Sequence, residues 1–156
     1  MAITTAMCNS FKTELLGRLH DLDSDTLKLA LIKASPSGSY GASTTNYSDV
    51  TGNSDEATGT GYTATGATLA GASISLSGST AIVDFTDVVF TSSTISADGC
   101  IIYNTTTGRT GLAAGAAIAV IDFGGTKTST NGDFTVEFPP SGGGSPDSTN
   151  AIIRIA

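Results

Sequence analysis

The chain is poor in the side chains that carry out chemistry. Its 156 residues include one His, two Cys and no Trp, and only 13% of them are charged. Cys8 and Cys100 stand far apart, with no CxxC pair and no Cys/His cluster of the spacing that binds zinc. The sequence leaves open whether they form a disulfide, although burial as two free thiols is the simpler interpretation. The composition predicts a protein that is not an enzyme and that holds no metal and no cofactor.

Positive charge and long apolar runs are also scarce. The net charge is -7, and an acidic surface repels the phosphates of nucleic acids. No stretch approaches the roughly 18 apolar residues of a membrane span. The N-terminus lacks the basic segment and apolar run of a signal peptide. We therefore predict no nucleic-acid partner, no membrane partner and synthesis in a host cytoplasm.

Small and hydroxyl side chains dominate instead. The sequence contains 25 Thr, 19 Ser and 19 Gly, while 39% of the residues are hydrophobic. Threonine suits a half-buried pleated surface, and glycine allows tight turns. A chain of this length forms one domain with a core of its own, here residues 1–156. The composition favours many short strands.

One amphipathic helix is predicted, over about residues 5–19. Met7, Phe11 and Leu15 recur every four residues and form one apolar stripe. Thr4 or Thr5 is expected to cap the first turn. The stripe packs either inside the monomer or on a partner, and the sequence leaves both open.

The rest of the chain, about residues 26–156, shows the apolar–polar alternation of strands, interrupted by residues typical of turns. Residues 26–33 place three Leu side chains on one face. Ser77-Gly78-Ser79 and Asn131-Gly132 indicate turns, and a hairpin connection is expected between Phe123 and Phe134. Further strands are predicted at 72–76, 80–85, 88–90, 99–104, 116–123, 134–138 and 151–155. This pattern predicts an all-β fold, an antiparallel β-sandwich of the jelly-roll kind or a barrel.

A long polar loop is expected at residues 35–66. A loop of this length in a compact domain is usually functional. It contains Tyr40, Tyr47 and Tyr62. Tyrosine is enriched at interfaces but also fixes loops to their own domain. The three tyrosines are therefore candidate interface residues, as is the helix stripe of Met7, Phe11 and Leu15.

An acidic stretch after the helix resembles the start of a calcium loop. Asp21, Asp23 and Asp25 alternate as oxygen ligands do, but Thr26 stands where that loop needs Gly and Ile32 where it needs Glu. We interpret the stretch as a solvated turn.

Two further groups are candidates for catalysis. His20 is the only histidine, no Gly-x-Ser-x-Gly motif accompanies it, and a capping or surface role at the helix end fits it better. Asp84, Asp87 and Asp122 could form a carboxylate pair for glycoside hydrolysis, but the chain lacks the Trp of a sugar platform. We interpret these three Asp residues as solvent-facing residues of strands.

The order of motifs in the second half resembles that of small virion structural proteins of tailed bacteriophages. Residues 84–88 (Asp-Phe-Thr-Asp-Val) lead into 94–104 (Thr-Ile-Ser-Ala-Asp-Gly-Cys-Ile-Ile-Tyr-Asn), then into 119–125 and a strand at 134–138. In size and composition the chain is most similar to capsid decoration (cement) proteins.

This resemblance implies a non-enzymatic subunit located in the virion. It would stabilise the shell by bridging capsomers, with the major capsid protein and copies of itself as partners. A tail, connector or fibre-associated structural or receptor-binding module is the alternative, with residues 35–66 as the recognition loop.

Overall fold

The computed structural model describes residues 2–140 and 145–156. Its strands are β1 (Ala6–Met7), β2 (Leu27–Lys33), β3 (Ala67–Thr68), β4 (Ser73–Ser77), β5 (Thr80–Asp84), β6 (Val88–Asn104), β7 (Ala116–Val136) and β8 (Ile153–Ile155). Two short helices, α1 (Asn9–Leu16) and α2 (Ser48–Gly52), complete the described elements. The predicted all-β, antiparallel, sandwich-like fold is confirmed.

Five strands form the large sheet, in the order β1-β7-β6-β2-β3, with every neighbouring pair antiparallel. The long strands β6 and β7 pair from Asn104 opposite Ala116 to Val88 opposite Val136. The hairpin connection expected between Phe123 and Phe134 is wrong, because residues 124–133 continue β7 along β6. Asn131, with φ 50°, lies at an irregularity in this ladder and does not close a turn.

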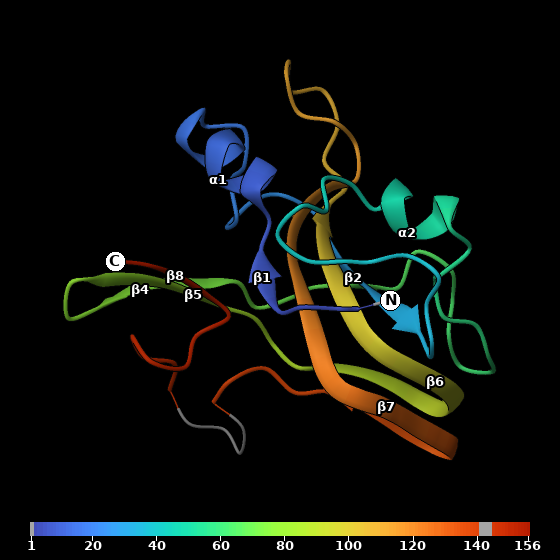
Figure 1. The fold of residues 1–156 in the computed structure, drawn as a ribbon. Helices are drawn as coiled ribbons and strands as arrows, with labels where there is room; N and C mark the ends of the chain where they lie inside the picture. The colour runs from blue at the N-terminus through green and yellow to red at the C-terminus, as the bar shows by residue number, and fades with distance from the viewer. Residues whose placement is uncertain (1, 141–144) are drawn as a thin grey trace.

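The other three strands form a smaller sheet, in the order β4-β5-β8, which we call the projecting sheet. Figure 1 shows it extending to the left of the large sheet, on the same side as α1. Its β4–β5 hairpin turns at Gly78-Ser79, as the Ser-Gly-Ser signal predicted. Gly78 has φ +62°, which glycine adopts without steric cost.

The base of the projecting sheet and the large sheet share one hydrophobic core. Leu29 and Ile102 of the large sheet, Val83 and Ile153 of the projecting sheet, and Phe11 of α1 are all buried in it. Burial of this apolar surface is the main stabilising contribution to the fold. The segment with α2 lies on the opposite side of the large sheet from α1 (Figure 1).

The N-terminal region departs from the predicted helix over 5–19. Residues 6 and 7 pair with β7, and Met7 lies opposite Ala119. The helix therefore begins only at Asn9, and Cys8 takes the N-cap position in place of Thr4 or Thr5, without a side-chain capping bond. Strand pairing prevails here because it satisfies backbone groups at the edge of β7.

The prediction of a single helix was also wrong. Residues 48–52, inside the expected loop 35–66, form α2. Asp49 organises the approach to this helix: its Oδ2 accepts hydrogen bonds from the backbone N–H of Thr45 (2.8 Å) and of Asn46 (3.2 Å). Such local Asp-to-backbone bonds compete with extended structure.

Candidate interaction surface

The loop segment 35–66 is fixed to the domain by a buried carboxylate. Asp55 is fully buried and accepts hydrogen bonds from Ser37 N–H (2.9 Å), Gly38 N–H (2.7 Å) and Tyr40 Oη (2.6 Å). Lys33 Nζ lies 3.0 Å from the same carboxylate. Burial alone would raise the pKa of Asp55, but these donors outweigh it and hold the pKa well below its usual range.

A second carboxylate binds the other two tyrosines. Glu56 accepts hydrogen bonds from the hydroxyls of Tyr47 and Tyr62. Tyr47 also stacks on Tyr103, with ring centroids 4.4 Å apart. Burial raises the pKa of Tyr103 to about 12, and its hydroxyl donates to Thr65 O. These tyrosines attach the loop to the large sheet.

The hydroxyls of Tyr40, Tyr47 and Tyr62 thus have partners inside the monomer, and Tyr40 is buried. A further role of these residues at an interface with another protein stays a prediction.

The helix stripe also faces inward for the most part. Phe11 is buried, with its ring against that of His20 at a centroid distance of 4.9 Å. Met7 and Leu15 are half-buried against the core. The prediction that all three form one helical stripe was wrong for Met7, which lies in β1.

A polar network joins the end of α1 to the large sheet. His20 lies 2.9 Å from Glu14 Oε2 and 3.1 Å from Asn104 Nδ2. Asn104 also donates to Asp25 (2.6 Å), and Arg109 pairs with Asp25 at 2.6 Å. His20 and the Asp25 side chain are buried, so a surface position for His20 and a fully solvated acidic turn were both wrong. The network stabilises the packing of the turn on β6.

The three candidate strand carboxylates do not form one site. Asp87 accepts a hydrogen bond from Phe138 N–H, and Asp122 accepts one from Gly124 N–H. Both residues are exposed, as expected. Asp84 is only half-exposed, and its Oδ1 is a buried atom with no hydrogen-bond partner among the described residues, which corrects its predicted solvent-facing position.

Both cysteines are free and buried. Burial is the main cause that raises the pKa of Cys8 to about 12, and burial raises the pKa of Cys100 as well. The thiolate is the reactive form. We therefore expect neither thiol of the native protein to react with a thiol-specific disulfide reagent at pH 8, and both to react in denaturant. Rapid labelling of the native protein would contradict this burial.

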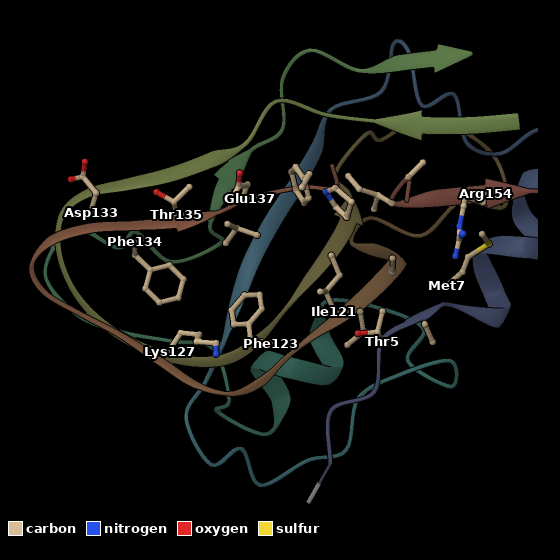
Figure 2. Close-up of a pocket in the computed structure, with 18 of the residues that line it drawn as sticks. Thr5, Met7, Ile121, Phe123, Lys127, Asp133, Phe134, Thr135, Glu137 and Arg154 are labelled. Carbon is tan, nitrogen blue, oxygen red and sulfur yellow. The ribbon is translucent and has the colours of Figure 1, made fainter. Parts of the chain in front are cut away.

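A groove of about 780 Å³ opens beside β7. Figure 2 shows its apolar lining of Ile121, Phe123 and Phe134. Its four charged residues are spread over the view: Asp133 and Arg154 lie at opposite ends, and Glu137 and Lys127 lie on opposite sides. The groove is an apolar seam between the two sheets and offers no clustered reactive groups.

Among the described residues, the projecting sheet carries three of the five large hydrophobic side chains that are exposed. Because facing residues of antiparallel strands share a side, its registers place six apolar side chains on one face, which we call the apolar face: Ile74, Leu76, Ala81, Val83, Ile153 and Ile155. Val83 and Ile153 are buried against the core, whereas Leu76 is 71%, Ile74 55% and Ile155 47% exposed.

A second groove, of about 530 Å³, runs along the apolar face where it approaches α1 and the following turn. Leu15 and Leu22 line its other wall, beside Arg18 and Arg109. This arrangement, an apolar centre with charges at the margin, is typical of protein–protein interfaces. The apolar face is therefore the candidate interaction surface.

Sequence reasoning overlooked this surface, although the sequence carried a signal for it. Residues 73–77 read Ser-Ile-Ser-Leu-Ser, which places both large apolar side chains on one side of a strand. No charged residue occurs between Glu56 and Asp84.

No protein-family model, no curated protein and no solved structure matches the chain. Among residues 2–140 and 145–156, no three His, Cys, Asp or Glu side chains lie close enough together to hold a metal ion. The helices in that part of the chain are too short to cross a membrane.

Proposed function

We propose that the chain is a non-enzymatic structural protein of a bacteriophage virion, a capsid decoration subunit that stabilises the shell by bridging capsomers. The observation that carries the proposal is the apolar face. Leu76, Ile74 and Ile155 are exposed on a hydrogen-bonded sheet whose base is part of the core. Exposed apolar surface of this kind marks a contact with another protein.

The polar clusters support the same proposal. The carboxylates Asp25, Asp55 and Glu56 bind donors of the chain itself and fix loops to the sheets. Groups committed to internal hydrogen bonds favour a rigid subunit, and a rigid subunit loses little conformational freedom on binding. Repetition over a lattice then adds many weak contacts into a strong attachment.

The alternative of a receptor-binding loop finds less support. Residues 35–66 are joined to the large sheet through Asp55, through Glu56 and through the stack of Tyr47 on Tyr103. An adaptable recognition loop would present such side chains to solvent. A tail or connector location stays open to the labelling experiment below.

Binding to capsids that lack the chain tests the proposal. Purified protein is expected to co-sediment with such capsids, and Ile155→Asp is expected to weaken this binding at least tenfold, because it places a charge on the apolar face. Val89→Asp is the matched control, since Val89 is also a strand residue with 47% exposure but lies on β6. Equal binding by both variants would show that the apolar face does not contact the capsid.

Immunogold labelling of intact particles tests the location directly. Gold over the head supports the decoration role. Gold at one vertex or along the tail would replace it by a connector, tube or fibre role, and particles without gold would overturn the virion proposal.

A further inference from the structure

The outer edge of the projecting sheet is an uncovered strand. In the order β4-β5-β8, β4 pairs only with β5. Ser73, Ile74, Ser75 and Leu76 are exposed. At the turn end, Ser77 Oγ accepts a hydrogen bond from Ser148 N–H (3.2 Å), but this contact is made by a side chain, and no described strand pairs with the outer backbone edge of β4. Soluble proteins usually protect such edges with Lys, Pro or a bulge. β4 contains none of these.

The hairpin turn fixes which backbone groups of β4 point outward. Ser77 faces Thr80 across the two residues Gly78 and Ser79, and Gly78 has a positive φ, as in a type II′ turn. The residues that close such a turn form a hydrogen-bonded pair, and hydrogen-bonded and open pairs alternate along the ladder. The N–H and C=O groups of Ile74 and Leu76 are therefore directed away from β5.

We propose that two copies of this chain associate by pairing β4 with β4, antiparallel, about a two-fold axis through Ser75. This register overlaps all five residues of the strand. It sets Ile74 opposite Leu76 of the second copy and Ser73 opposite Ser77 of the second copy. The outward backbone groups of Ile74 and Leu76 then form the hydrogen bonds, and the two projecting sheets become one six-stranded sheet.

Charge favours a second copy as the occupant of this edge. The chain has a net charge of -7, so most of its surfaces repel each other when brought close. The stretch between Glu56 and Asp84 is free of charge, and β4 lies inside it. Pairing at β4 therefore brings no like charges into contact, and an isologous contact needs only a self-complementary patch.

Pairing also enlarges the apolar face. Antiparallel neighbours keep facing side chains on one side, so Ile74 and Leu76 of both copies join the two apolar faces into one surface. This inference goes beyond the proposed function, because it depends on β4 alone and holds in solution whether or not the protein binds a capsid.

Disulfide trapping with Ser75→Cys tests the register. Ser75 faces itself across the two-fold axis in an open pair, where Cα atoms are about 4.5 Å apart, within the range of a disulfide. Ser73→Cys is the matched control: four residues separate it from its own copy along the strand, about 13 Å. Cys8 and Cys100 are buried and do not compete.

With oxidised glutathione at pH 8, we expect Ser75→Cys to form a covalent dimer at least tenfold faster than Ser73→Cys, as measured on non-reducing gels. Equal rates, or no dimer from either variant, would overturn the proposed pairing. A Ser75→Cys cross-link formed only to another protein of the particle would assign the edge to that protein and overturn self-pairing.

A second variant separates pairing from folding. Ile74→Pro removes a donor that points away from β5, a position at which edge strands tolerate proline. In the unmodified background we expect sedimentation velocity to show a concentration-dependent dimer. Ile74→Pro should stay monomeric with an unchanged circular dichroism spectrum. A dimer of undiminished affinity in Ile74→Pro would overturn the proposal, and so would a monomeric wild-type protein at all concentrations.

Discussion

Replacing Gly66 by alanine is expected to lower the free energy of unfolding by more than about 3 kcal/mol. Gly66 has φ +70°, and an added Cβ would lie 1.9 Å from Leu29 O and 2.7 Å from Ala30 Cα. Both atoms belong to the backbone of β2, so no side-chain rotation relieves the overlap. The chain just after Gly66 forms β3 and pairs with β2, and this pairing must open to admit a methyl group.

Gly78→Ala is the matched control for this prediction. Gly78 has almost the same backbone angle, φ +62°, but nothing lies within 4 Å of an added Cβ. Its cost is limited to the left-handed conformation of a non-glycine residue, about 1 kcal/mol. Urea unfolding followed by circular dichroism measures both losses. Similar losses in the two variants would show that the close approach to β2 does not decide the role of Gly66.

Strands with a clear alternation could be predicted closely from the sequence. The segment expected at 26–33 became β2, because its Leu residues alternate and it pairs with β3 on one edge and β6 on the other. The opposite face is not solvated, since Ala30 and Ile32 are buried as well. The turn at Gly78 was equally clear, since the Ser-Gly-Ser signal lies between the two strands predicted at 72–76 and 80–85.

Residues 124–133 show where that reasoning fails. They are rich in Gly, Thr and Ser and have no apolar periodicity, yet they continue β7. Contacts with the partner strand β6 hold them in the sheet: Ala97 lies opposite Lys127, and Ser96 Oγ lies 2.9 Å from Thr128 Oγ1. Strand formation in such a polar arm depends on cross-strand contacts, which a local pattern does not contain.

The internal polar contacts could not be predicted for a related reason. Asn104 binds His20 and Asp25 across more than 70 residues of sequence. A histidine after a helix has the same local pattern whether it is exposed or buried. Part of the apolar face, in contrast, could have been predicted, because the alternation of Ile74 and Leu76 in β4 is a local pattern. That β5 and β8 continue the same face depends on the sheet order.

Asp55→Asn is expected to lower the free energy of unfolding by about 3 kcal/mol at pH 7. The carboxylate accepts from Ser37, Gly38 and Tyr40, and an amide has one acceptor oxygen in place of two. Its NH₂ group would face donors. Lys33 is partly exposed and is solvated again at little cost, so the neutral donors account for most of the loss. Asp23→Asn, at an exposed position, should change stability by less than about 0.5 kcal/mol.

The same substitution should change how stability depends on pH. The folded-state pKa of Asp55 lies well below its usual range, whereas the unfolded chain has the ordinary value of about 3.9. The stabilisation from this carboxylate is therefore complete above about pH 5 and declines as the pH falls toward the folded-state pKa. Urea unfolding at pH 7, 5, 4 and 3 should show the wild type losing its advantage over Asp55→Asn in acid. A difference that stays constant over this range would mean that the folded protein does not favour ionised Asp55, because the wild type loses stability in acid only if the unfolded chain takes up a proton at Asp55 that the folded protein does not.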